Sequence, residues 1–389
     1  MSIAEQEVEP TLAAEEEKRT GYLELFFDLV FVFAFTQVTT LVLEDTSAGG
    51  LARAALIFAL VWWAWSAYAW LTNAIDVDNV GTRLFVFAAM LAAFFVALAV
   101  PDAYTDEGVW FATAYFAVRV LHVALYVWGV RDDPVQRIAV LRLAPWFLVA
   151  PTVALAGGFA DDPWRTSLWT ISISIDVVGT LFAAGFRVSA AHFVERYGLI
   201  VIIALGESIV AIGVAALELE RDGVFALAVA VSFAGAAAAW WAYFDSTQLA
   251  VERALHAASE ETRGHLARDV FTFFHYPIVF GIILLAVAAK KTLGGPGEPL
   301  SDAGRAALAL GISLFLLGFV LTRYRVIRRI AWERIGAALV VVAAVLVLDG
   351  ADALLLLALT VAALVAALAL EALRRRSVRA RLEGTLQPH

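Results

Sequence analysis

Long apolar blocks, separated by short polar breaks, run through almost the whole chain. Each block is about 18–24 residues long, the length of α-helix that crosses a hydrocarbon core of about 30 Å. A helix is also the form in which such a block satisfies its own backbone in lipid. We therefore predict an all-α integral membrane protein with about twelve transmembrane helices, at 22–43, 51–72, 83–100, 108–130, 138–157, 166–187, 196–217, 223–244, 270–290, 303–322, 330–348 and 351–372.

The polar breaks define the organisation of the chain. Most are short, so consecutive helices are expected to be antiparallel. The longest, at about 246–269, is charged and is expected to be helical at a membrane surface. We divide the chain into a polar N-terminal tail (1–21), a first half of six helices (22–187), a second half of six helices (188–372) and a basic C-terminal tail (373–389).

Composition supports a chain that is solvated mainly by lipid. Hydrophobic residues make up 62% of the 389 residues and charged residues 17%, with a mean hydropathy of +0.81. Soluble domains have about 45–50% apolar residues and about 25% charged ones. The net charge of −9 argues against a nucleic-acid partner, which calls for a basic surface. The absence of cysteine excludes disulfides and thiolate chemistry.

Lysine and arginine are distributed unevenly between the two sides that the twelve helices define. The side of the N-terminus holds most of them, including the run Arg374–Arg376 in the C-terminal tail. The opposite side holds only Arg53, Arg165, Arg221, Lys290, Lys291 and Arg305. Basic residues mark the cytoplasmic side of membrane proteins. We therefore predict a multi-pass protein of the cell membrane with both termini in the cytoplasm.

The chain contains a candidate internal repeat. An aromatic cluster begins at Trp62 in the second predicted helix, and a similar cluster begins at Trp240 in the eighth. An intramembrane acid precedes each cluster at a similar distance, Asp28 in the first half and Glu207 in the second. Six helices in each half would make the halves parallel repeats. The alternative is that both clusters are interfacial aromatic belts.

Two acids lie on one face of the first predicted helix. Glu24 and Asp28 are four residues apart, and Gln37 continues the polar stripe. A charge at mid-bilayer is unfavourable by at least about 2.5–3.5 kcal/mol, so it faces a partner, a cavity or water. One interpretation is a cation or proton site that opens toward the cytoplasm. The other is that Glu24 lies among headgroups and Asp28 pairs with an arginine.

The seventh predicted helix carries Glu207 near its middle, between Gly206 and Ser208. Glycine removes side-chain bulk beside the acid, so a helix or a substrate could approach it. Burial favours the neutral carboxyl group over the carboxylate, which suits a proton carrier. The alternative is a neutral glutamate that forms a hydrogen bond across a helix interface.

The fourth predicted helix places Arg119 and His122 near mid-membrane, three residues apart on one face. An arginine at that depth needs a carboxylate partner, and Asp176, Asp28 and Glu207 are the candidates. We predict that Arg119 and Asp176 form a charge pair that rearranges, or else a structural lock. His122 is a candidate proton relay, or a packing residue.

Three further polar residues lie where the seventh and ninth predicted helices begin. His192 and Glu195 precede the seventh helix, and His275 lies near the start of the ninth. They would extend a polar path to the cytoplasm or serve as interfacial residues. No His-Glu-x-x-His run or dense ligand cluster occurs. We therefore predict no catalytic residue, no metal site and no cofactor.

Two stretches resemble the signatures of a known family. The first helix contains ELFFDLVFVF from Glu24 to Phe33, and the seventh region contains HFVERYGL from His192 followed by IIALGES to Ser208. Both resemble the bacterial low temperature requirement A family. The resemblance implies a multi-helix membrane protein without a settled biochemical activity. It directs attention to Glu24, Asp28, His192, Glu195, Arg196, Glu207 and Ser208.

A second likeness is shorter. The phenylalanine-rich first helix is similar to the Phe-Ser-Asp opening of a lysosomal and bacterial potassium-channel family, but Phe27 stands where that family has serine.

The leading functional hypothesis is a secondary transporter or channel for a small solute or ion, coupled to protons through the intramembrane carboxylates. The first alternative is a membrane enzyme for lipid or isoprenoid substrates, with His192, Glu195 and His275 as its candidates. The second alternative is a non-catalytic sensor or scaffold. A polar cavity near mid-bilayer favours transport, and a pocket at headgroup depth favours an enzyme. The substrate, the coupling ion and the oligomeric state stay open.

Overall fold

The computed structural model describes residues 18–182, 186, 188–217, 220–245 and 247–385, and the regular secondary structure of these residues is helical. The helices are α1 (Tyr22–Glu44), α2 (Ala48–Ala74), α3 (Val80–Ala99), α4 (Gly108–Gly129), α5 (Pro134–Gly158), α6 (Trp164–Leu181), α7 (Ala190–Leu217), α8 (Gly223–Phe244), α9 (Thr247–Ala257), α10 (Glu260–Ala267), the π-helix η1 (Arg268–Phe274), α11 (His275–Leu293), α12 (Asp302–Ile327), α13 (Trp332–Val347) and α14 (Ala353–Thr385). The prediction of an all-α chain is confirmed.

Ten segments are long and apolar enough to cross a membrane. They contain α1 to α5, α7, α8, α11, α12 and α14. The helices α6 and α13 fall outside this set. α13 has only 16 residues, and α6 has 18 residues that include Arg165 and Asp176. The structure thus supports a multi-pass membrane protein, with ten candidate spans among the described residues.

Two helix boundaries differ from the sequence-based prediction. The seventh helix was expected to begin at 196, but α7 begins at Ala190 and so includes His192 and Glu195. It is longer because His192 and Arg196 are buried against partners inside the protein rather than placed at a polar helix end. The last helix was expected to end at 372, but α14 continues to Thr385. Its basic residues are compatible with a helix that leaves the bundle.

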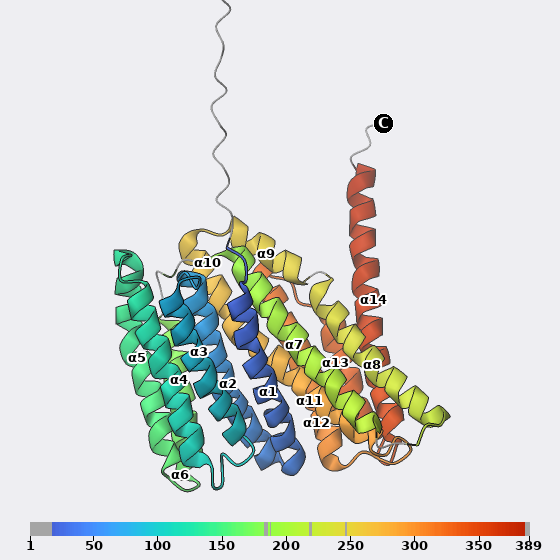
Figure 1. Ribbon diagram of the computed structural model, residues 1–389. Helices are drawn as coiled ribbons and strands as arrows, with labels where there is room; N and C mark the ends of the chain where they lie inside the picture. The colour runs from blue at the N-terminus through green and yellow to red at the C-terminus, as the bar shows by residue number, and fades with distance from the viewer. Residues whose placement is uncertain (1–17, 183–185, 187, 218–219, 246, 386–389) are drawn as a thin grey trace, which may run out of the picture.

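Figure 1 shows the long helices side by side in one bundle. α5 and α6 lie at one edge, α8 and α14 lie at the other, and α1, α7 and α11 lie between them. The short helices α9 and α10 lie across the end of the bundle at which α1 begins, and the C-terminus is at this same end. The described residues 247–267 of the predicted surface segment therefore form a helical cover on one end of the bundle.

The helices within each half of the chain pack on one another in a defined order. In the first half α1 packs on α2 and α3, α4 packs on α3 and α5, and α6 packs on α5 and α2. In the second half α7 packs on α8 and α11, α12 packs on α11 and α13, and α14 packs on α13 and α8. The halves meet where α1 packs against α7 and α11.

Helices α11 and α12 approach each other closely, and glycine makes this approach possible. A Cβ atom added to Gly281 would lie 2.6 Å from the backbone nitrogen of Phe315 and 2.7 Å from the carbonyl oxygen of Gly311. These atoms are backbone, so they cannot turn away as a side chain would. Small residues allow membrane helices to approach in this way.

We expect Gly281→Ala to destabilise the protein by about 1–3 kcal/mol, because the added methyl group must push α11 away from α12. Unfolding in mixed micelles, followed by tryptophan fluorescence, measures this loss. Gly213→Ala is the matched control, since nothing lies within 4 Å of a Cβ added there. Equal stability of the two variants would contradict the packing described for α11 and α12.

Candidate functional site

A ladder of buried charges joins α1 to α7. His192 Nε2 lies 2.8 Å from Glu24 Oε1, and Arg196 Nη2 lies 2.9 Å from Asp28 Oδ1. Each partner is four residues from the next on its own helix, so the two pairs occupy successive turns of both helices. All four side chains are at most 2% exposed. The first motif and the second motif of the sequence therefore meet face to face.

Aromatic side chains enclose the inner pair of this ladder. Trp65 Nε1 donates a hydrogen bond of 2.8 Å to Asp28 Oδ1. The guanidinium of Arg196 lies 5.9 Å from the ring centroids of both Phe27 and Trp65. Rings at this distance attract a cation through their π-electrons. Asp28 is thus held by an arginine and a tryptophan, out of contact with solvent.

The segment before α1 is tied to the same ladder. The backbone nitrogen of Thr20 donates to Glu195 Oε2 at 2.9 Å, and that of Gly21 donates to Glu24 Oε2 at 2.8 Å. Glu195 therefore binds the start of α1 rather than lining an open path. These contacts fix the end of α1 against the end of α7.

A second buried ion pair joins α4 to α6. Arg119 donates to both carboxylate oxygens of Asp176, with distances of 2.6 Å and 2.8 Å, and its Nη1 also lies 2.9 Å from the Tyr115 hydroxyl. Arg119 and Asp176 are completely buried. Among the three carboxylates proposed as partners of Arg119, the structure selects Asp176. A bidentate arginine–carboxylate pair of this kind is strong and geometrically specific.

Glu207 lies on α7 away from both pairs. It is 7% exposed and lies beside Thr36 of α1, whose hydroxyl donates to the Val32 carbonyl at 3.2 Å. Ser208 donates to the carbonyl of Ala204 on its own helix, at 3.0 Å. A Cβ added to Gly206 would meet nothing within 4 Å. Among the described residues no helix approaches Gly206, because this face of α7 points away from the packed helices. The approach of a substrate to Gly206 stays a prediction.

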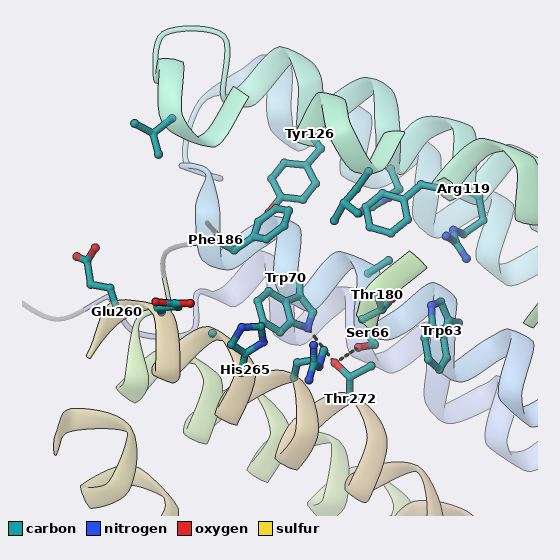
Figure 2. Close-up of a pocket in the computed structure, with 18 residues that line it drawn as sticks. Trp63, Ser66, Trp70, Arg119, Tyr126, Thr180, Phe186, Glu260, His265 and Thr272 are labelled. Carbon is teal, nitrogen blue, oxygen red and sulfur yellow. Dashed lines mark hydrogen bonds between the residues drawn. The ribbon is translucent and has the colours of Figure 1, made fainter. Parts of the chain in front are cut away.

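A cavity of about 610 Å³ lies between helices of the first half and the segment of α10 and η1. Figure 2 shows it extending from Glu260 of α10 at one end to Arg119 and Trp63 at the other. Residues of α2, α4, α5, α6, α10 and η1, together with Phe186, line it: Trp63, Ser66, Ala67, Trp70, Arg119, His122, Tyr126, Val135, Leu143, Phe147, Thr180, Phe186, Glu260, Glu261, Gly264, His265, Arg268 and Thr272. Asp28, Asp176 and Glu207 are not among them, so the three acids do not share this cavity.

The π-helix η1 forms part of the cavity wall. Thr272 Oγ1 accepts a hydrogen bond of 3.0 Å from Trp70 Nε1 and lies 3.2 Å from Ser66 Oγ, as Figure 2 shows. Short π-helical turns occur frequently at functional sites. This network joins η1 of the second half to α2 of the first half, directly beside the cavity.

The candidates of the enzyme hypothesis do not meet at one place. His192 pairs with Glu24, whereas His275 lies 2.8 Å from the Val270 carbonyl and 2.9 Å from the Tyr243 hydroxyl. Within the described part of the chain, no three His, Asp or Glu side chains are grouped to hold a metal ion. None of His192, Glu195 and His275 lines the cavity.

Sequence reasoning missed most of the cavity. Tyr126 lies four residues after His122 and seven after Arg119, so helical spacing alone would have placed it on the same face. Trp70 was attributed to no function, and Thr272 was not singled out. No pattern in the sequence predicts a π-helix at Arg268–Phe274 or the position of α10 across one end of the bundle.

We expect Arg196→Met to destabilise the protein by about 3–5 kcal/mol, because it leaves Asp28 buried without its cation. Unfolding in mixed micelles measures this loss. The double variant Asp28→Leu with Arg196→Met should recover a large part of it. Arg83→Met is the control, since Arg83 and Asp78 form an exposed pair worth less than about 1 kcal/mol. A loss at Arg196 as small as at Arg83 would contradict the buried ladder.

Comparison with known proteins supports the family resemblance that the two motifs indicate. Residues 19–370 match the family model described as Bacterial low temperature requirement A protein (LtrA). The chain is also similar to the uncharacterized protein RA0937 of Rhizobium meliloti (strain 1021), with 32% identity over 330 residues that cover 81% of this chain and 79% of the relative. The match extends from the segment before α1 into α14 and includes both sides of the charge ladder. The chain belongs to the bacterial low temperature requirement A family.

Proposed function

We propose that the protein is a secondary transporter of a small organic solute, which binds in the cavity between α2, α4, α5, α6, α10 and η1. The observation that carries this proposal is the depth of the cavity. It leads from α10, at one end of the bundle, to Arg119 at the middle of α4. Its volume of about 610 Å³ is that of a site for an organic molecule, for which about 300–1,000 Å³ is usual.

The proposal includes twelve membrane spans, and the direction of α7 supports α6 as one of them. The ladder pairs Glu24 with His192 and Asp28 with Arg196, so α1 and α7 run in the same direction. Two helices that point the same way across a bilayer have an odd number of crossings between them. The four apolar helices α2 to α5 therefore need α6 as the fifth.

A similar argument supports α13 as a span. Arg334, at its start, donates to Glu371 of α14 and to the Ala242 carbonyl near the end of α8. The start of α14 is tied to the opposite end of the bundle, where Ala353 donates to the carbonyl of Glu298 between α11 and α12. α13 therefore runs from one end of the bundle to the other.

The same packing supports parallel repeats of α1–α6 and α7–α14. Glu24 and His192 are 168 residues apart, and so are Asp28 and Arg196, which gives both ladder pairs equivalent places in the two halves. The aromatic clusters do not add support, because Trp62 is buried whereas Trp240 is 47% exposed. The repeat therefore rests on helix packing and on the ladder.

The distribution of lysine and arginine supports an orientation with both termini in the cytoplasm of the cell. The start of α1, the end of α14 and the helices α9 and α10 lie at one end of the bundle. The cavity then faces the cytoplasm through the side that α10 covers.

The ladder also indicates which parts would move during transport. Separating α1 from α7 at the α10 end of the bundle would unpair the buried Arg196 and Asp28, with a loss of about 3–5 kcal/mol, and would also break the buried contact of His192 with Glu24. The hydrogen bonds that tie η1 to α2 instead join neutral groups, and the described contacts include no ion pair between α10 and α2. We therefore assign the gating motion to α10 and η1, with the α1–α7 contact as the fixed part.

We expect Ala67→Phe to reduce solute flux by about tenfold or more, because the added ring fills the cavity beside Ser66 and His122. Solid-supported membrane electrophysiology on proteoliposomes, with a panel of organic acids, organic cations, amino acids and sugars, measures the flux. Ala230→Phe is the control, since Ala230 is exposed on α8. Wild-type protein without solute-dependent current, or equal currents from both variants, would contradict the proposal.

Proton coupling is proposed through Glu207, the buried acid that is not part of an ion pair among the described contacts. We expect Glu207→Gln to keep solute exchange but to abolish its acceleration by a pH gradient, because an amide cannot carry the proton. Counterflow and gradient-driven uptake in the same proteoliposomes separate the two steps. Unchanged gradient-driven uptake would remove Glu207 from the coupling mechanism.

A further inference from the structure

Three charged side chains form a cluster where η1 meets α12, separate from the charge ladder. Asp269 Oδ1 accepts a hydrogen bond of 2.7 Å from Arg268 Nη2, and Asp269 Oδ2 accepts one of 2.8 Å from Arg325 Nε of α12. The side chains of Arg268, Asp269 and Arg325 are 13%, 19% and 26% exposed. One carboxylate thus holds two arginines, one with each oxygen.

Arg268 extends this cluster to the first half of the chain. Its Nη1 donates to the carbonyl of Leu181, the last residue of α6, at 3.3 Å, and its side chain lines the cavity. Carbonyls in the last turn of a helix lack partners within the helix and favour a nearby cation. The contacts therefore run from α6 through Arg268 and Asp269 to α12, and they hold η1 to both halves of the protein.

Whatever holds η1 also holds α10. The helix α10 ends at Ala267 and η1 begins at Arg268, so the two form one continuous segment. α10 lies across the end of the bundle, as Figure 1 shows, and it contributes Glu260, Glu261, Gly264 and His265 to the wall of the cavity. The charged cluster is therefore placed to fix the position of α10 beside the cavity.

The junction of η1 and α11 provides a pivot for this segment. In a π-helix the carbonyl of Thr272 would accept from the nitrogen of residue 277, but Pro277 has no N–H. The indole of Trp62 donates to this carbonyl instead, at 2.8 Å. Kinks in helices occur at prolines and at π-helical turns, and both features coincide here. α10 and η1 can therefore tilt together relative to α11.

The partial exposure of the cluster suits contacts that break and form again. The charges of the ladder are at most 2% exposed, so separating Asp28 from Arg196 would leave both without water. Such a separation is strongly unfavourable. Asp269 and Arg325 lie closer to solvent, and water can hydrate them once they part. The cluster therefore opposes opening without preventing it.

We propose that Asp269, together with Arg268 and Arg325, is a latch that holds α10 and η1 in place and controls access to the cavity. Separation of Asp269 from Arg325 frees the segment to tilt about Pro277 and opens the cavity to the cytoplasm. This inference rests on the proposed function for the idea that α10 and η1 form the gate. It names the residues that set how often the gate opens.

A single introduced thiol tests the latch, because the chain has no cysteine of its own. Ala67→Cys places the thiol in the cavity of the full-length protein in lipid nanodiscs, and mass spectrometry follows its modification by N-ethylmaleimide. We expect Asp269→Asn to raise the rate about tenfold, the lower end of what a hydrogen bond to a charged group is worth. Arg325→Gln, which changes no residue of the cavity wall, should have the same effect. The double variant should add little to either, because both remove one contact.

Two controls separate the latch from a general loosening of the protein. Asp245→Asn removes another ion pair, since Asp245 lies 2.6 Å from Arg375 between α8 and α14, away from the cavity. It should leave the rate at position 67 unchanged. A second reporter, Ala34→Cys, places the thiol at a site in α1 that is 2% exposed and outside the cavity, and it should stay unreactive in every variant.

Three outcomes would overturn the latch. They are an unchanged rate at position 67 in both Asp269→Asn and Arg325→Gln, an equal rise in Asp245→Asn, and a matching rise at position 34. The latch and transport also fail separately. A rate that depends on Asp269, with no solute-dependent current in proteoliposomes, would overturn transport and keep the latch. Solute currents that Ala67→Phe abolishes, with a rate that does not depend on Asp269, would overturn the latch and keep transport.

Discussion

The structure depends on one constraint, which is that a charge inside a lipid-spanning helix must find its counter-charge within the protein. Asp28 and Arg196 satisfy each other across α1 and α7, and Arg119 and Asp176 do so across α4 and α6. These contacts join segments that are 168 and 57 residues apart in the chain. Because lipid offers such groups no alternative, the ion pairs specify which helices lie together.

This constraint also explains why the two family motifs occur together. The motif in α1 contributes two carboxylates and the motif in α7 contributes a histidine and an arginine, in the same spacing. Their first role is therefore to join the halves of the protein. Polar atoms without hydrogen-bond partners occur both in the ladder, at Asp28, His192 and Arg196, and beside the cavity, at Arg119 and His122, but no residue of the ladder lines the cavity. The residues that hold the fold together and the residues that would hold a ligand are thus largely different.

The sequence was informative wherever a local pattern determined the outcome. Apolar blocks located the helices closely, because span length and backbone satisfaction in lipid leave few alternatives. The spacing of Glu24 and Asp28 placed both on one face, and the depth of Arg119 required an acid. The choice among three acids, and the identity of Arg196 as the partner of Asp28, depend on packing between distant helices. The cavity, the π-helix η1 and the fold of α10 over the bundle likewise arise only in three dimensions.

The central claim is that buried charges join the helices while the cavity between α2, α4, α5, α6, α10 and η1 takes the solute. A cryo-electron microscopy map of the protein in lipid nanodiscs, saturated with a solute that the flux measurements identify, tests this claim most directly. The account predicts solute density in this cavity, with the pair of Asp28 and Arg196 intact. Ligand density between Asp28 and Arg196 or at Glu207, with the α4 cavity unoccupied, would contradict it.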